Sequence, residues 1–347
     1  MTGKRIVLTT FGSYGDIHPY MALASELQTR GHHPVIATSE PYREKMQSAG
    51  FDFVPVRPNI PPPQDQDSQT MEKVMKPMTG GKFLLDEMLI PYLRDGYDDL
   101  LEVVRGADML VTHLITFAGP LVAQKTGIPW VSSVLAPCSF FSAYDPPVPP
   151  FWPWLRHIQI FGPRLVTAFF KHAMKMYSNK AYYRFRDELG LPDRGNPMFE
   201  GQHSPTLVLA LFSKLFAQPQ PDWPPQARVT GFAFYDGRKE LEMPVELSRF
   251  LDDGPPPIVF TLGSSAVWVA QDFYRESIAA AKLLGRRAVL LIGDNRNRPS
   301  ISGDPLPPGI IAVDYAPFEA LLERGCAMVH HGGVGRVCHR NSQIPAL

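Results

Sequence analysis

The amino-acid sequence predicts an α/β protein built from two facing, doubly wound, Rossmann-like domains. Short apolar strands alternate with amphipathic helices in two successive series, which is the pattern of parallel sheets covered by helices on both faces. A proline-rich stretch, Gly254–Pro257, separates the two series, and 347 residues are enough for about two domains. We therefore predict an N-terminal domain over residues 1–230, a linker over 231–254 and a C-terminal domain over 255–347.

The first series begins close to the amino terminus. Ile6–Thr10 is apolar and β-branched and predicts a buried strand, and Gly12 and Gly15 then predict a turn. Pro19–Thr29 repeats apolar residues at helical spacing, and Pro34–Thr38 is a second strand, so the segment forms a βαβ unit. The pattern continues with a strand over 108–112, a helix over 117–125 and strands over 130–134 and 207–211.

The second series follows the prolines at 255–257. Ile258–Leu262 predicts a strand, Gly263–Ser265 a turn, Phe273–Leu284 a helix and Ala288–Ile292 a strand. The remaining elements are a strand over 310–313, a helix over 317–323, a strand over 327–330 and a glycine turn over 332–335. Doubly wound sheets bind ligands beyond the carboxyl ends of their strands, so the residues just after each strand are the candidates for a site.

Composition excludes several classes of protein. Lys plus Arg and Asp plus Glu both number 34, so the formal net charge is zero and we expect no nucleic-acid partner. The three cysteines, Cys138, Cys326 and Cys338, have neither metal-ligand nor disulfide spacing, which indicates a reducing, cytoplasmic location. No apolar run reaches the ~18 residues of a membrane-spanning helix.

The first motif with chemical potential is Gly12–Pro19, which reads Gly-Ser-Tyr-Gly-Asp-Ile-His-Pro. Its glycines let the backbone turn tightly and approach a ligand. Asp16 would project from the strand end just before a helix, where a carboxylate can accept a proton from a substrate hydroxyl. The alternative is that Asp16 only caps the helix that starts near Pro19.

The second motif is His330–Gly335, which reads His-His-Gly-Gly-Val-Gly after a predicted strand. Glycines ahead of a helix expose backbone N–H groups to an anion, and a histidine can donate a hydrogen bond to a phosphate. The alternative is a tight strand-to-helix turn with a packed histidine. Two adjacent histidines before two glycines favour phosphate binding.

Two weaker motifs follow other strands, and several well-known motifs are absent. Gly263–Ser265 lines the same nucleotide site or is only a turn, and the aromatic face of Tyr315 in Asp314–Pro317 would suit a stacked base. Asp65 and Asp67 lie in a Pro/Gln-rich loop rather than at a strand end, so we expect no metal. The sequence contains no P-loop, no Rossmann glycine pattern after the first strand and no nucleophile elbow.

Taken together, these motifs resemble the family 1 nucleotide-sugar glycosyltransferases, which have the GT-B fold. The nearest branch contains the sterol glucosyltransferases and the glycopeptide and macrolide glycosyltransferases. The resemblance covers nearly all of 4–335 and rests on an ordered set of segments: Gly12–Pro19, Phe117–Pro120, Gly127–Pro129, Asp222–Pro224, Val229–Phe232, Asp314–Pro317 and His330–Gly335.

The resemblance implies an enzyme that transfers a hexose, with inversion and without a metal or other cofactor. The donor is a UDP-sugar or another nucleoside-diphosphate sugar, and the acceptor is a hydroxyl of an apolar molecule such as a sterol or polyketide. Asp16 stands where many members carry the catalytic base, and members of the glycopeptide branch have Asp there. We hypothesise that Asp16 and His113 form a carboxylate–histidine pair that shares a proton; alternatively, His113 is a satisfied residue of the cleft wall.

The resemblance also implies residues that bind the two substrates. His331 matches the family's diphosphate-binding histidine, and Tyr315 matches the aromatic position beside the base. The full donor set comprises Ser13, Gly263, Ser264, Ser265, Tyr315, Ala316, Pro317, His330, His331, Gly332, Gly333, Val334 and Gly335. The aromatic residues Phe117, Phe140 and Phe141 are the candidates for acceptor contacts.

The sequence departs from the family after Gly335. Arg336–Leu347 lacks the Asp/Glu-Gln pair that holds the sugar hydroxyls in other members. We therefore expect a truncated member with an incomplete second domain, an exposed sheet edge and a lost donor site. The alternative to an active transferase is a non-catalytic homologue that acts as a binding module or is an inactive fragment.

The segment over 152–186 raises the question of a membrane surface. Seven basic residues and no acidic ones lie between Arg156 and Arg186, interleaved with Trp, Phe and Met. Such a face could make peripheral contact with a membrane. The alternative is a pair of core-packed helices with a solvated basic side.

Overall fold

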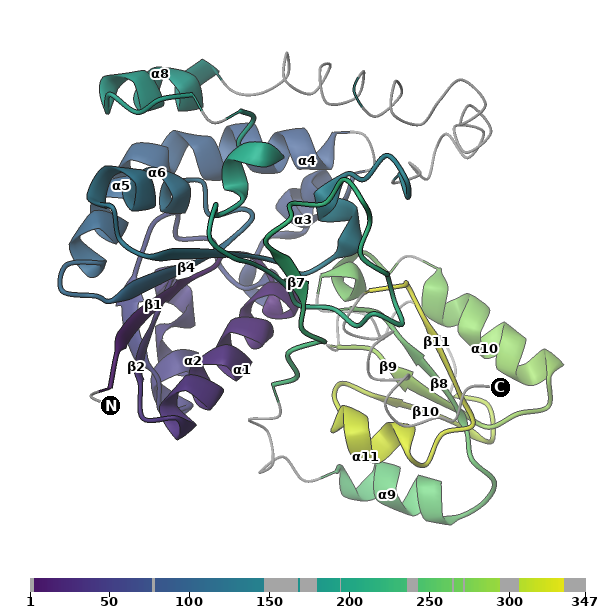
Figure 1. Ribbon diagram of the computed structural model, residues 1–347. Helices are drawn as coiled ribbons and strands as arrows, with labels where there is room; N and C mark the ends of the chain where they lie inside the picture. Colours follow the sequence, from purple (N-terminus) through teal and green to yellow (C-terminus); the bar gives the residue numbers. More distant parts are fainter. Residues whose placement is uncertain are drawn as a thin grey trace. The chain divides into compact units, whose positions relative to one another are not determined.

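A computed structural model of the chain describes residues 3–76, 79–146, 168, 180–193, 195–235, 243–263, 265–270, 272–293 and 306–333 (Figure 1). The described residues form two compact units. The first unit lies within Met1–Gly12, Asp16–Pro61 and Gly81–Tyr235. The second lies within Ser13–Gly15, Pro62–Gly80 and Asp236–Leu347, so two short segments from the first third of the chain belong with its carboxyl-terminal part.

The first unit is built on a parallel sheet of seven strands in the order β3-β2-β1-β4-β5-β6-β7. The strand order reverses between β1 and β4, because the chain first adds strands on one side of β1 and then on the other. The strands are β1 (Arg5–Thr9), β2 (His33–Thr38), β3 (Asp52–Pro55), β4 (Met109–His113), β5 (Trp130–Val134), β6 (Val208–Ala210) and β7 (Ala227–Val229).

Helices cover both faces of this sheet, which is why its central strands are apolar throughout (Figure 1). The helices of this unit are α1 (Tyr14–Thr29), α2 (Arg43–Ser48), α4 (Gly80–Phe83), α5 (Leu93–Val103), α6 (Ala118–Thr126) and α8 (Lys180–Glu188). Short helical turns are Glu40–Tyr42, Leu84–Leu89, Ile90–Tyr92, Pro137–Phe140 and Glu200–Gln202. One core joins β1 and β4 to α5, α6 and α8 through Val7, Leu110, Leu100, Leu121 and Phe185.

Helix α1 begins earlier than the sequence predicted. We expected it to start near Pro19, whereas it starts at Tyr14 and carries Pro19 inside it. A proline inside a helix removes a single backbone donor, and burial of Ile17, Tyr20 and Met21 holds the helix through that position. Asp16 therefore lies in the first turn of α1 and not in a loop ahead of it.

The second unit contains a parallel sheet of four described strands in the order β10-β9-β8-β11, so its order reverses between β8 and β11. Alternate residues of β8 and β9 enter two cores: Phe260 and Leu290 pack with α10, and Val259 and Val289 pack with α9 and α11 (Figure 1). The strands are β8 (Ile258–Thr261), β9 (Ala288–Leu291), β10 (Ile310–Val313) and β11 (Ala327–His330). The helices are α3 (Ser68–Met75), α9 (Val245–Asp252), α10 (Phe273–Leu283) and α11 (Phe318–Leu322), with short turns at Pro63–Asp65 and Ala266–Val269.

These two sheets confirm the predicted α/β class with two doubly wound parts. Each predicted strand exists within one or two residues of its expected ends, whereas β3 and β7 were not predicted. Both are short and only partly buried, so they lack the apolar run that marks the central strands.

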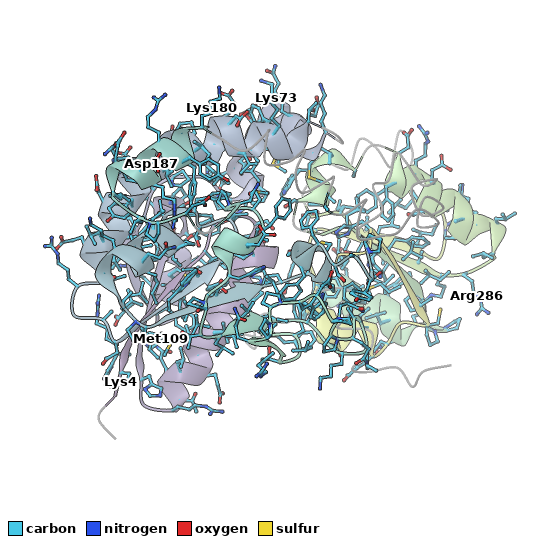
Figure 2. The ribbon with its side chains drawn as sticks, turned by 45° about the horizontal axis from the view of Figure 1, so that its top comes forward. Lys4, Lys73, Met109, Lys180, Asp187 and Arg286 are labelled. Carbon is cyan, nitrogen blue, oxygen red and sulfur yellow. The ribbon has the colours of Figure 1, made fainter. Side chains whose placement is uncertain are left out.

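Hydrogen bonds to the carboxylate of Asp108 connect the amino ends of β1 and β4. Lys4 Nζ lies 2.8 Å from Asp108 Oδ1, and the Arg5 backbone N–H donates to Asp108 Oδ2 at 2.9 Å. These hydrogen bonds hold the pKa of the Asp108 carboxyl below its ordinary value. Figure 2 shows Lys4 and Met109 together at this end of the sheet, so the carboxyl ends of the strands lie at the opposite edge.

Most of the basic segment 152–186 lies outside the described residues. Within the described part, Arg186 is buried in α8, where Nε donates to Pro192 O at 2.8 Å and Nη2 donates to Gln124 Oε1 at 2.6 Å. This guanidinium is therefore used inside the protein and is not part of a basic surface. Among the described residues, no helix has the length and apolar character that crossing a membrane requires.

Candidate functional site

The first site lies at the carboxyl ends of β1 and β4, where the strand order of the seven-stranded sheet reverses. Such a switch point is where open α/β sheets bind ligands. Thr9 pairs with Thr112, so the next residues, Thr10 and His113, are neighbours across the strands. Thr10 Oγ1 lies 3.2 Å from His113 Nδ1, and both residues are buried.

Asp16 is held over the turn that leaves β1. A Cβ atom on Gly12 would lie only 2.4 Å from Asp16 Oδ2, so the carboxylate is folded against the Gly12 backbone. Gly12 has a φ of +113°, which side-chain-bearing residues rarely adopt. Position 12 therefore requires glycine for two reasons: the backbone conformation of the turn and the space that the Asp16 carboxylate occupies. Asp16 itself is half-buried, in the first turn of α1, where the helix dipole favours a negative charge.

His113 lies beneath this turn rather than at the surface. Only 4% of the residue is exposed, and burial lowers the pKa of its imidazole. The negative charge of Asp16 and a hydrogen bond with the Phe11 backbone act in the opposite direction and raise that pKa in part. The structure thus brings Asp16 and His113 to one switch point and couples them electrostatically; proton sharing between them stays a prediction.

Sequence reasoning missed the polar residues around His113. Tyr20 of α1 lies over the sheet with its ring centroid 5.9 Å from that of His113, and its hydroxyl is 2.6 Å from Ser133 Oγ. Ser133 pairs with His113 across β4 and β5, so Thr10, His113 and Ser133 form one row across three strands. Burial raises the pKa of Tyr20, which keeps its hydroxyl protonated. Only the register of the sheet reveals this row.

The second site lies at the carboxyl ends of β8 and β11, the switch point of the four-stranded sheet. The Gly263 backbone N–H donates to His331 Nδ1 at 3.0 Å. Because Nδ1 is the acceptor, the proton of the neutral ring is on Nε2. A Cβ atom on Gly263 would lie 2.5 Å from His331 Cε1, and one on Gly333 would lie 2.7 Å from Nε2. The imidazole therefore lies close against two glycine backbones, although His331 is exposed.

The glycines after β11 continue this arrangement. Gly332 has a φ of +86° and donates its backbone N–H to His330 Nδ1 at 3.1 Å. Tyr315 follows β10 and is 38% exposed, whereas Ala316 is buried and Pro317 half-buried. β10 and β11 are the two edges of the described sheet, so β9 and β8 separate the strand before Tyr315 from the strand before His331.

The other predicted donor residues are only partly described. Ser265 is half-buried directly before the short helix Ala266–Val269, and Ser13 accepts a hydrogen bond from the Gly15 backbone N–H at 3.2 Å. Ser13–Gly15 belongs to the second unit together with His331. Ser264, Val334 and Gly335 lie outside the described residues.

The three candidate acceptor residues differ in exposure. Phe117 belongs to the core of the first unit, and Phe140 stacks on Trp223 with ring centroids 4.3 Å apart, so protein neighbours cover both. Phe141 is half-buried, packs edge-on against Phe199 and has an unusual φ of +47°. Of the three, Phe141 offers the most side-chain surface to a ligand.

Asp222 holds the segment that contains these aromatic residues. Its Oδ1 accepts a hydrogen bond from Ser142 Oγ at 2.6 Å, and its Oδ2 accepts one from the Ala143 backbone N–H at 2.7 Å. The segment follows β5, at the same edge of the sheet as His113. The carboxylate thus fixes the backbone beside Phe141, a role that the Asp-Trp-Pro motif did not disclose.

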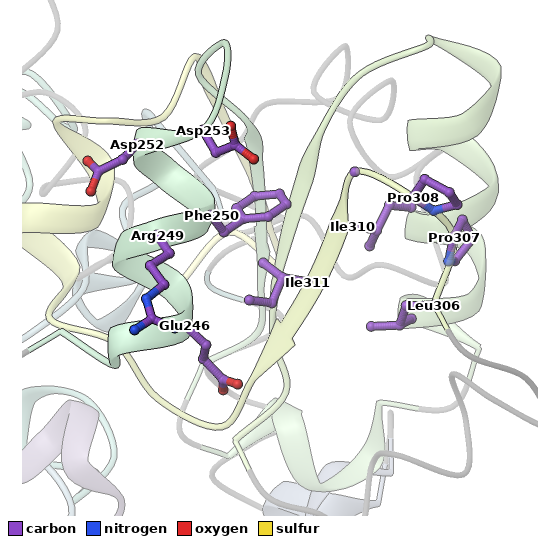
Figure 3. Close-up of a pocket in the computed structure, with 11 residues that line it drawn as sticks. Glu246, Arg249, Phe250, Asp252, Asp253, Leu306, Pro307, Pro308, Ile310 and Ile311 are labelled. Atoms are coloured by element: carbon purple, nitrogen blue, oxygen red, sulfur yellow. The ribbon is translucent and has the colours of Figure 1, made fainter.

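A separate pocket of about 770 Å³ lies in the second unit between α9 and residues 306–311 (Figure 3). Charged residues Glu246, Arg249 and Asp253 share its wall with Leu306 and Pro307. The pocket lies at the amino end of β10, whereas Tyr315 follows the carboxyl end of that strand. None of the predicted site residues lines it. No cluster of three potential metal ligands occurs among the described residues.

A two-part α/β protein with a candidate site at the switch point of each sheet has the architecture of the GT-B glycosyltransferases, and comparisons with known proteins show that class. The N-terminal domain of glycosyltransferase family 28 matches residues 6–86. The chain is 30% identical to the O-mycaminosyltylonolide 6-deoxyallosyltransferase of Streptomyces fradiae, over 95% of this chain and 76% of that protein. It is 29% identical to the sterol 3-beta-glucosyltransferase of Leptosphaeria maculans, over 95% of this chain but only 23% of that longer protein.

The solved structures show the same fold. The calicheamicin glycosyltransferase superposes with a TM-score of 0.63 at 18% identity, covering 98% of this chain and 77% of that one. The spinosyn forosaminyltransferase superposes with a TM-score of 0.63 at 16% identity, covering 97% and 77%. The chain belongs to the GT-B glycosyltransferases, in the family of the macrolide and sterol enzymes, which confirms the resemblance seen in its motifs.

Proposed function

We propose that this protein transfers a hexosyl group from a nucleoside-diphosphate sugar, in the first instance a UDP-sugar, to a hydroxyl of an apolar small molecule. The reaction inverts the anomeric centre and uses no metal or cofactor. The observation that carries the proposal is the exposed His331 ring, whose Nδ1 accepts the Gly263 N–H while two glycine backbones flank the ring.

In the proposed donor site, the His331 ring would supply the hydrogen-bond donor that a diphosphate needs. With Nδ1 occupied, Nε2–H is the ring's hydrogen-bond donor, and a donor aimed at a leaving diphosphate stabilises the charge that develops there. The exposed Tyr315, beyond the other edge strand of the sheet, would stack on the nucleoside base. The ribose would lie between Tyr315 and the diphosphate at His331.

At the proposed acceptor site, Asp16 acts as the general base. Its carboxylate takes the proton of the acceptor hydroxyl while the hydroxyl oxygen forms a bond to the anomeric carbon. The bond from that carbon to the diphosphate oxygen breaks in the same step, and the electron pair leaves with the diphosphate. One displacement inverts the anomeric configuration, and a carboxylate together with hydrogen-bond donors suffices without a metal.

Relatives and neighbouring structures narrow the choice of substrates to test. A sterol 3-beta-glucosyltransferase and an O-mycaminosyltylonolide 6-deoxyallosyltransferase among the relatives favour a sterol or polyketide acceptor. One neighbouring structure is a glycosyltransferase in complex with dTDP, and another is a rhamnosyltransferase complexed with thymidine diphosphate. The donor nucleotide should therefore be tested as UDP and as dTDP.

Isothermal titration calorimetry of the full chain with UDP, dTDP and UDP-glucose tests the donor site. In contrast to the lost donor site expected from the sequence, we expect micromolar binding of at least one of them, because the His331 ring and its glycine neighbours are in place. We expect a loss of about tenfold, ~1.4 kcal/mol, in His331→Ala. His32→Ala, in the first unit, is the matched control and should bind like the wild type. No heat with any ligand would contradict the proposal and favour the non-catalytic alternative. Product formation from UDP-glucose and cholesterol, with and without EDTA, then tests transfer and its independence of metal.

A further inference from the structure

Thr10 occupies the centre of the switch point in the first unit. It is fully buried, and its Oγ1 lies 3.2 Å from His113 Nδ1 on the neighbouring strand. The same oxygen lies 3.4 Å from the backbone carbonyl of Phe11 and 3.4 Å from that of Asp16. A single hydroxyl thus touches the end of β4, the turn after β1 and the first turn of α1.

His113 is poorly placed to meet a substrate directly. It is 4% exposed, lies under α1 and is surrounded by Thr10, the Phe11 backbone and the Tyr20 ring. Asp16, in contrast, is half-buried, with its carboxylate over Gly12. Apart from their electrostatic coupling, an influence of His113 on the position of Asp16 has to pass through the groups that lie between them.

The hydroxyl of Thr10 can make that link because it carries one hydrogen and can also accept. When Nδ1 of His113 is the acceptor, the Thr10 hydrogen points to the imidazole. When Nδ1 carries a proton, it donates to Thr10, whose own hydrogen can then bond the carbonyl of Asp16 or that of Phe11, both 3.4 Å away. The position of the proton on His113 thus decides whether the Thr10 hydrogen is available to hold the first turn of α1.

We propose that Thr10 is a positioning residue, whose hydroxyl connects buried His113 to the first turn of α1 and so sets the position of the Asp16 carboxylate. His113 then acts on the reaction through Thr10 and does not touch the substrate. This inference rests on the proposed function, in which Asp16 is the base.

A double-mutant cycle tests the link in the full chain, with UDP-glucose and cholesterol as probes. Thr10→Val keeps the shape of the side chain and removes the hydroxyl, and a carboxylate displaced by up to 1 Å should lower kcat on the order of 10²-fold. Thr10→Ser keeps the hydroxyl and should retain kcat within a few-fold. His113→Leu should cost about as much as Thr10→Val, and the double variant no more than either. If the fold-losses in kcat of the two single variants multiply in the double variant, the inference is overturned, because His113 would then act independently of Thr10.

A second readout needs no substrate and so separates this inference from the proposed function. The ¹³C chemical shift of the Asp16 carboxyl, recorded by NMR at one fixed pH, reports its surroundings, with Asp16→Asn used to assign the signal. We expect this chemical shift to change in Thr10→Val and to stay at the wild-type value in Thr10→Ser, with equal UDP affinity in both. An Asp16 chemical shift identical in wild type and Thr10→Val would refute the link even in an active enzyme. A changed chemical shift in a chain without transferase activity would support the link and leave only the proposed function refuted.

Discussion

The backbone N–H of Gly263 and Nδ1 of His331 are 3.0 Å apart, although 68 residues separate them in the chain. Parallel pairing of β8 with β11 brings them together, because Thr261 and His330 are partners at the ends of the two strands. This hydrogen bond selects the tautomer of the histidine and fixes its ring plane. The Nε2–H of His331 thereby becomes a hydrogen-bond donor with a fixed orientation at the switch point of the sheet.

Adding a methyl group at Gly263 should displace the His331 ring. The new Cβ would lie 2.5 Å from Cε1, well inside van der Waals contact. We expect Gly263→Ala to weaken nucleotide binding by about tenfold or more, ~1.4 kcal/mol, with little loss of thermal stability. Calorimetry with UDP and dTDP measures this. Gly81→Ala, where a Cβ meets no atom within 4 Å, is the control and should bind normally. Equal affinities in the two variants would show that the ring position does not matter.

Gly12→Ala should impair catalysis beyond its effect on stability. Its φ of +113° imposes backbone strain of about 1–3 kcal/mol on alanine, and its Cβ would meet Asp16 Oδ2 at 2.4 Å. Gly31→Ala shares the strain, at φ +79°, but meets no atom within 4 Å. Both variants should lose stability in urea unfolding, whereas only Gly12→Ala should lose kcat, on the order of 10²-fold. A matching loss of kcat in Gly31→Ala would assign the effect to strain alone.

Burial of His113 should make folding sensitive to mild acid. Its pKa in the folded protein lies below its ordinary value, so the unfolded chain binds more protons as the pH falls below about 6.5. The contribution of His113 is therefore full above that pH and is lost as the pH falls toward the folded pKa. Urea unfolding of wild type and His113→Leu between pH ~7.5 and ~5 measures it. The wild type should lose more stability than the variant; parallel curves would be inconsistent with a depressed pKa.

Asp222→Asn should loosen the segment beside Phe141. Asparagine keeps one acceptor for Ser142 Oγ or for the Ala143 N–H but places an amide donor against the other. We expect a loss of about 1–2 kcal/mol in unfolding free energy and a higher KM for cholesterol, with the UDP affinity unchanged. Asp145→Asn, at an exposed position close by, serves as the matched control. An unchanged acceptor KM would remove the segment from acceptor binding.

Local patterns predicted much of the fold and part of the candidate site. The strands Ile258–Leu262 and Ala327–His330 were predicted within a residue or two, because apolar β-branched runs bounded by glycine depend on short-range properties. The start of α1 was predicted wrongly, since Pro19 suggested a helix start that buried contacts of Ile17 and Tyr20 override. Phe117 and Phe140 are apolar, but nothing local distinguishes a core aromatic from one that meets a ligand.

The amino-acid sequence alone specified which segments form buried strands and that glycines, histidines and Asp16 come directly after them. Strand propensity and turn chemistry depend on only a few neighbouring residues. Only the tertiary structure decided which of these ends meet. Register across parallel strands placed Thr10 beside His113 and Gly263 beside His331, and helix packing buried His113 while leaving Asp16 half-exposed. Those pairings join residues 103 and 68 positions apart, and such distant contacts depend on the free energy of the whole fold rather than on any local pattern.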